Sequence, residues 1–208
     1  MRLEGNENTW EELGQLIFGG TRDQPYDPKL ARIAPWETIT RFENLEKLVL
    51  HAFDFGPELI FLVPLAIDFS KLTYLELINC DNAAEIMCLD VEWTNLKKVC
   101  LEAQDPGAVK TFLRNARGLQ EIFFVDLVCD APSLTISDLV GLICERHGDT
   151  LQSLALKPEA LGLPQESGFL GGFDFIKLAR GSKHLRELRI AFNFTDWVSP
   201  PPAFPPEI

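Results

Sequence analysis

A six-residue phrase recurs along this chain: an apolar residue, two variable residues, an apolar residue, one variable residue and a final apolar residue. The first leucines of successive copies lie 27, 24, 23, 32 and 34 residues apart. Apolar and polar residues alternate over the last positions of each copy, which predicts a short strand. A strand repeated at this spacing indicates stacked units that share one core, since no single unit can bury its own apolar faces. The six copies span residues 45–50, 72–77, 96–101, 119–124, 151–156 and 185–190.

The segments between the phrases predict helices or irregular returns. Residues 105–118 show this most clearly, because Asp105 can cap a helix and Pro106 suits its first turn. Residues 137–147 and 169–181 carry apolar residues at helical spacing and predict two further helices. Alternation of strands and helices of this kind indicates the α/β class.

The phrase resembles the leucine-rich repeat family, whose pattern is L-x-x-L-x-L-x-x-N/C-x-L. Leu72 to Cys80 matches the first nine positions, and Leu185 to Asn193 does so with Ile190 in place of the third leucine. The resemblance covers residues 40–195. It is greatest to the irregular, helix-backed repeats of F-box-type substrate receptors, although the chain contains no proline-led F-box pattern.

Four copies depart from the family at the ninth position of the pattern. In the family, an Asn or Cys at this position bonds to backbone groups in the turn after the strand. Without that side chain we expect more variable turns and a less regular array. The departing copies have Phe53, Gln104, Leu127 and Glu159 there.

The resemblance implies a leucine-rich repeat solenoid with a curved parallel sheet on its concave side and helices or irregular segments on its convex side. Residues 41–196 would form the array of about six repeats. Residues 1–40, with a short helix expected over 9–18, would form an N-terminal cap, and the proline-rich residues 197–208 an extended tail. The alternative is an ordinary compact α/β domain whose leucine-rich strands mimic the repeat.

Composition excludes several partners. The 208 residues carry a formal charge of −12, which repels nucleic acid and anionic membranes. The strongest apolar run, residues 59–67, is too short to cross a bilayer, which needs about 20 residues, so we expect it to be buried. The polar N-terminus shows no signal sequence, so we expect the protein to lie in the cytoplasm or nucleus. We also expect a monomer. The five cysteines are odd in number and lack C-x-x-C spacing, so we expect neither a disulfide nor a metal site. We also expect no cofactor.

No catalytic constellation is found in the sequence. A nucleophilic triad needs a histidine beside a serine or cysteine, and nothing in the sequence brings Cys100 to His51. His147 and His184 fall at or just beyond expected helix ends, where a partial positive charge suits the helix dipole. We therefore expect no enzyme activity. An enzyme domain with an unrecognised active site remains the alternative.

A binding surface is the function that the resemblance implies. In leucine-rich repeat strands the first, fourth and sixth positions face the core, and the third, fifth and seventh face outward on the concave sheet. The chain is thus expected to be a protein–protein interaction module, such as the substrate-recognition part of a ubiquitin-ligase receptor, with an unidentified protein partner. The expected contact residues are Lys47, Val49, His51, Tyr74, Glu76, Ile78, Lys98, Cys100, Glu102, Glu121, Phe123 and Val125.

Overall fold

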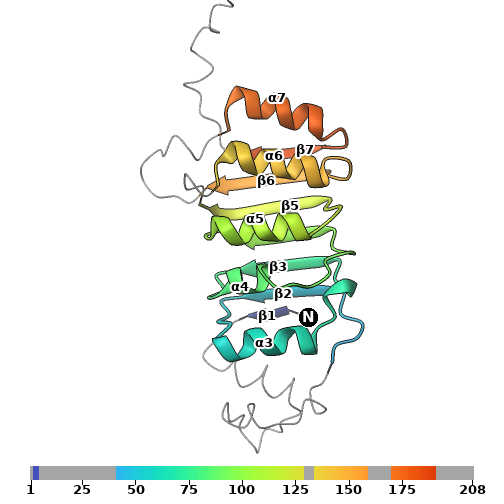
Figure 1. The fold of residues 1–208 in the computed structure, drawn as a ribbon, viewed down its shortest axis with the longest axis vertical. Helices are drawn as coiled ribbons and strands as arrows, with labels where there is room; N and C mark the ends of the chain where they lie inside the picture. The colour runs from blue at the N-terminus through green and yellow to red at the C-terminus, as the bar shows by residue number, and fades with distance from the viewer. Residues whose placement is uncertain (1, 5–40, 129–133, 159–169, 191–208) are drawn as a thin grey trace, which may run out of the picture.

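A single parallel sheet organises the described part of the chain, which in this computed structural model comprises residues 2–4, 41–128, 134–158 and 170–190. Its seven strands lie in sequence order, so each strand pairs with the next one along the chain (Figure 1). The strands are β1 (Arg2–Glu4), β2 (Lys47–His51), β3 (Tyr74–Ile78), β4 (Lys98–Glu102), β5 (Glu121–Leu127), β6 (Ser153–Pro158) and β7 (Glu187–Ile190).

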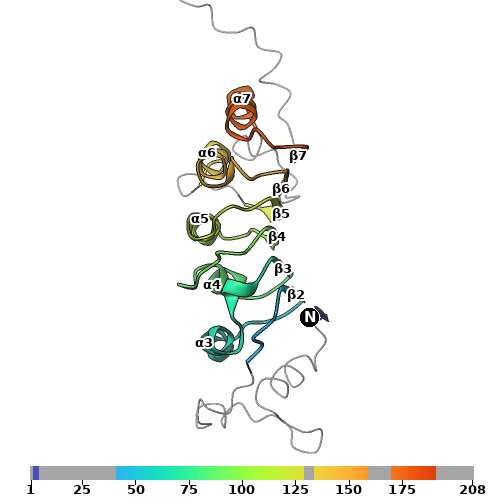
Figure 2. The same cartoon turned by 90° about the vertical axis from the view of Figure 1, so that its right-hand side faces the viewer.

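The described α-helices all lie on the same side of this sheet (Figure 2). The opposite face of the sheet is covered by no described helix, and we call it the open face. The arrangement establishes the α/β class. The helical elements are α3 (Pro57–Ala66), η2 (Phe69–Lys71), α4 (Ala83–Met87), α5 (Pro106–Asn115), α6 (Ile136–His147) and α7 (Gly172–Gly181).

The six phrases form strands β2 to β7, as predicted. Their fourth positions pair with one another across the sheet, and so do their sixth positions. Because strand side chains alternate between the two faces, the shared register directs both rows towards the helices. The fourth-position residues of the first five phrases are at most 1% exposed: Leu48, Leu75, Val99, Ile122 and Leu154.

Local sequence explains where the helices begin. Asp105 caps α5 as predicted, since its carboxylate accepts the N–H of Ala108 at 2.9 Å. Helix α6 begins one residue earlier than expected, because Thr135 and Asp138 form a capping box in which each side chain accepts the backbone N–H of the other. Helix α7 begins at Gly172, three residues later than expected.

Aromatic rings connect successive units inside the core. Trp93 is 1% exposed and packs edge-on against Phe69 from the preceding unit, with ring centroids 4.8 Å apart. On its other side it packs against Phe112 of α5, at 5.4 Å. Edge-to-face contacts of this kind add about 0.5–1.5 kcal/mol each to the burial of the rings. Neighbouring units therefore share one continuous core.

The ends of the chain differ in part from expectation. Strand β1 comes from the region expected to be a cap, yet it extends the sheet itself by pairing with β2. The apolar run at 59–67 lies within α3 and at its end, but only one side of the helix is buried, since Phe61 is 73% exposed. The helix expected over 9–18 and the tail at 197–208 lie outside the described residues. No helix in the described ranges has the length and apolar character that a membrane crossing requires.

The turn after each strand has a recurring backbone conformation. Ala52, Asn79 and Asp126 occupy the eighth position of three phrases, and their φ angles are 51°, 52° and 47°. At the ninth position the Cys80 thiol donates to the carbonyl of Leu50 at 3.4 Å, which is the backbone contact that the resemblance implies. The eighth position therefore requires the left-handed region in these three units.

Ala52→Gly should raise the free energy of unfolding by about 0.5–1 kcal/mol. A left-handed backbone costs an L-residue about 1–2 kcal/mol, and glycine avoids this cost while losing more chain entropy on folding. Ala103 is the matched control, because it occupies the eighth position of the third phrase without a positive φ and is fully buried. Ala103→Gly should destabilise the protein in urea titrations. Destabilisation of similar size by both changes would contradict the assignment of strain to Ala52.

Candidate functional site

The open face carries the residues expected to contact a partner. Strand alternation places the third, fifth and seventh positions on this face, and the register aligns them in rows across β2 to β5. The structure thus brings the twelve predicted residues together on four neighbouring strands. The rows are Lys47, Tyr74, Lys98 and Glu121; Val49, Glu76, Cys100 and Phe123; and His51, Ile78, Glu102 and Val125.

Val49 departs from this expectation, because it is only 5% exposed. The physical reason is the additional strand β1, whose Arg2 lies in register with Val49 on one side while Glu76 lies on the other. Val49 therefore has a neighbouring strand along both edges of β2. The other eleven predicted residues are at least partly exposed.

Lysines and aromatic rings alternate across the open face. The Nζ of Lys47 lies 4.5 Å from the centre of the Tyr74 ring, and the Nζ of Lys98 lies 5.6 Å from the same ring and 5.1 Å from that of Phe123. Lys98 also pairs with Glu121, with its Nζ 2.6 Å from Oε2. Cation–π contacts of this type contribute about 0.5–1 kcal/mol at exposed positions. They hold both rings in place before any partner binds.

Glu76 lies at the centre of a polar cluster. Its carboxylate receives the Tyr74 hydroxyl, and His51 Nε2 lies 2.7 Å from Oε1. Burial alone would raise the pKa of Glu76, but the hydrogen bonds from Tyr74 and His51 outweigh it and lower the pKa. Burial and the same carboxylate raise the pKa of Tyr74. Tyr74 therefore remains a hydroxyl donor, and Glu76 is an anion with its hydrogen-bonding capacity largely used inside the protein.

Cys100 has the properties of a packing residue rather than a nucleophile. Burial, together with the nearby Glu76 carboxylate, raises the pKa of its thiol to about 11. Almost no thiolate is present at neutral pH, and the thiolate is the reactive form. The described cysteines are free: Cys80, Cys88, Cys100 and Cys144. In the described ranges, His, Cys, Asp and Glu side chains form no group of three or more that could bind a metal ion.

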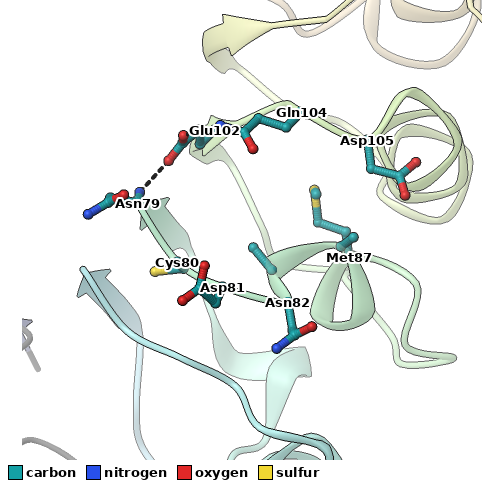
Figure 3. A pocket seen from close by; sticks show the side chains of 10 residues that line it. Asn79, Cys80, Asp81, Asn82, Met87, Glu102, Gln104 and Asp105 are labelled. Atoms are coloured by element: carbon teal, nitrogen blue, oxygen red, sulfur yellow. Dashed lines mark hydrogen bonds between the residues drawn. The ribbon is translucent and has the colours of Figure 1, made fainter.

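A pocket of about 350 Å³ lies at the carboxyl ends of β3 and β4 (Figure 3). It lies where the chain leaves β3 and β4, in front of α4 and the start of α5. Glu102 is its one lining residue among those predicted to bind a partner. No sequence signal locates it, because the described strands follow one another in sequence order and the sheet has no topological switch point that would single out one pair of strands. The pocket is lined by Asn79, Cys80, Asp81, Asn82, Ala83, Ala84, Met87, Glu102, Gln104 and Asp105.

The pocket combines carboxylates with an apolar patch. Glu102 accepts the backbone N–H of Asn79 and, at 2.6 Å, the amide of Gln104, and Asp105 caps α5. Two of its carboxylates therefore have structural roles in the turns. No lysine or arginine of the described residues pairs with the acidic residues of the pocket. The carboxylates lie next to the methyl groups of Ala83 and Ala84 and to Met87. The pocket therefore suits a ligand that carries a cation on an apolar stem rather than an anion.

His147 is buried rather than charged at the end of its helix. It is 1% exposed, and its Nδ1 accepts the N–H of Leu119 at 3.4 Å. Burial lowers the pKa of His147 to about 4, so the ring is neutral at pH 7. The expected stabilisation of the helix dipole by a positive charge is therefore wrong for this residue. The last turn of α6 packs under the chain that enters β5, which removes the ring from water.

Comparisons with known proteins gave no match. No protein-family model, curated protein or solved structure is significantly similar to this chain. Function must therefore be argued from the repeated phrases and from the open face.

Proposed function

We propose that the chain is a leucine-rich repeat protein that binds a partner protein on its open face and catalyses no reaction. One observation carries this proposal: the helices lie on one face of the sheet, and the other face presents an ordered set of partly exposed side chains (Figure 2). Strands formed by the repeated phrases lie in one register, which supports the repeat assignment. Their first, fourth and sixth positions line the helix-covered core, as in that family.

The chemistry of the open face suits a protein partner. Tyr74 and Phe123 offer large rings that their lysine neighbours already immobilise, so little conformational entropy is lost when a partner covers them. Ile78 on β3 and Val125 on β5 add apolar area on the same two strands as the rings. Aromatic anchors of this kind, surrounded by charged groups, are typical of the residues that dominate protein interfaces.

Internal pairing of its charges makes the open face selective. Lys98 pairs with Glu121, and His51 lies against Glu76. A partner must leave these pairs intact or replace both members, because a charge buried without its partner costs several kcal/mol. Apolar contact at the rings would then supply affinity, and the surrounding charges would set orientation.

Substrate recognition for a ubiquitin ligase is the form of partner binding that we propose. The basis is the resemblance of the phrases to F-box-type substrate receptors. The 208 residues contain no F-box pattern, so we assign the ligase contact to none of them. The alternative is an enzyme whose active site is the pocket at the ends of β3 and β4. Asp81→Asn changes a pocket carboxylate that is not among the expected contact residues, so it would lower activity in that case and leave binding at the rings unchanged.

Phe123→Ala should weaken binding of the partner roughly tenfold or more, because truncation of a central aromatic anchor typically costs about 2 kcal/mol. The partner is first recovered from native extract by pull-down and identified by mass spectrometry. It is then titrated calorimetrically against the wild type and the variant. Lys110→Ala on α5 is the control, since this residue lies on the helix side and should leave affinity unchanged. Equal affinities for all three proteins would exclude the open face around β5 as the binding site.

A further inference from the structure

The first and last described helices expose apolar side chains on their outer faces. Phe61 and Leu65 of α3 are 73% and 41% exposed, and Phe173 and Ile176 of α7 are 85% and 46% exposed. Spacings of four and three residues place each pair on one face of its helix. Within the described residues these four are the large hydrophobic side chains that are exposed. Helices α3 and α7 lie at opposite ends of the described stack of helices (Figure 1).

The outer faces of α3 and α7 lack a neighbouring helix, and the stacking of the other helices shows what such a neighbour does. Helix α5 packs between α4 and α6, and α6 packs between α5 and α7, so these two helices are covered on both sides. Beyond α7 no further described helix covers its outer face. The next unit of the same stack would place a helix there, and α3 of a second copy offers such a helix with an apolar outer face. In repeat proteins, end units with a polar outer face are the usual way to stop further stacking.

The two ends also carry opposite charge. Residues 170–190 contain five basic and two acidic residues, although the whole chain has a formal charge of −12. Residues 41–71 contain five acidic and three basic residues. The α7 end of one copy therefore attracts the α3 end of another, whereas two α7 ends repel each other. All five basic residues of the α7 end are exposed: Lys177, Arg180, Lys183, Arg186 and Arg189.

We propose that copies of this chain associate head to tail, with α3 of one copy packed against α7 of the next. Phe173 and Ile176 would contact Phe61 and Leu65, and the charges around them would set the direction. Such a contact is heterologous and leaves both outer ends free, so it produces open chains rather than closed dimers. This assembly differs from the monomer that we expected from the sequence. The apolar outer faces of α3 and α7 are visible only in the folded chain. It does not use the open face and stands independently of the function proposed above.

Sedimentation velocity over a concentration series tests this proposal on the full chain. The wild type should form species larger than a dimer as concentration rises, and high salt should reduce them because it screens the charges. Phe61→Lys and Phe173→Glu each place a repelling charge on one end. Each variant alone should remain monomeric at concentrations where the wild type associates. Glu145→Lys, an exposed charge change on the interior helix α6, is the control and should associate like the wild type.

Mixing the two variants separates a head-to-tail contact from other forms of association. Phe61→Lys retains an intact α7 end and Phe173→Glu an intact α3 end, so an equimolar mixture should associate again through these two intact ends, with dimers as the first species formed. Absence of dimers in the mixture would overturn the proposal, because a symmetric contact between like ends is not restored by mixing. A wild type that is monomeric at every concentration would also overturn it. If the wild type is monomeric and Phe61→Lys or Phe173→Glu lowers its melting temperature by several degrees, the altered phenylalanine packs against its own chain rather than against a second copy.

Discussion

Leu75→Ala and Ile122→Ala should each lower the free energy of unfolding by about 2–5 kcal/mol, because each removes a packed side chain and leaves a cavity. Both residues are 0% exposed and occupy the fourth position of their phrases. Each lies in a central strand, with a neighbouring strand on both sides and helices over its face. Urea denaturation of the two variants and the wild type measures the effect.

Phe123→Ala is the matched control for Ile122→Ala. The two residues are adjacent in β5, but Phe123 faces the open side of the sheet and is partly exposed. Its truncation should cost roughly 1 kcal/mol or less. Losses below about 1 kcal/mol at both Leu75 and Ile122 would mean that the phrases are not core strands. A larger loss at Phe123 than at Ile122 would mean that the two faces are reversed.

Acidification from pH 6.5 to pH 4 should remove about 3 kcal/mol of stability through His147 alone. Burial lowers the pKa of this histidine from 6.5 to about 4, and the positive charge of the neighbouring Arg146 acts in the same direction. Between these two pH values the unfolded chain binds a proton at His147 and the folded protein does not. Stability contributed by the neutral ring is therefore complete above pH 6.5 and is lost as the pH falls towards 4.

Urea titrations at a series of pH values test this dependence against two variants. In His147→Asn, an amide oxygen can accept the N–H of Leu119 without titrating, so the variant should lose about 3 kcal/mol less stability than the wild type over the same pH range. His184 is exposed, and His184→Asn should keep the wild-type dependence. Identical slopes for His147→Asn and the wild type would show that His147 does not cause the effect.

Local patterns in the sequence were sufficient to predict most of the fold. The inward position of Ile122 and the outward position of Phe123 follow from strand alternation, which needs no knowledge of distant residues. The start of α5 follows from Asp105 and Pro106, because a cap acts over three or four residues. In α6 the apolar spacing predicted a start at residue 137, but the capping box of Thr135 and Asp138 starts the helix one residue earlier, at Ile136.

The pocket could not be predicted in the same way. Its walls come from the segment after β3 and the segment after β4, including Asn79 and Glu102, which are 23 residues apart in the chain. A hydrogen bond from the backbone N–H of Asn79 to the Glu102 carboxylate joins the two segments (Figure 3). Such contacts depend on how parallel strands align, and the alignment is a property of the sheet rather than of either segment.

The sequence by itself determined the repeated strand, the face on which each of its side chains lies and the class of the fold, since these depend on periodicity within a few residues. Tertiary structure alone decided which of those side chains meet water. Val49 is buried because β1, more than 40 residues earlier in the chain, pairs with its strand. His147 is neutral because its helix end packs beneath the chain entering β5. Phe61 and Phe173 are exposed because their helices lie at the ends of the stack. Burial and charge state depend on neighbours that are distant in sequence, and only the folded chain brings those neighbours together.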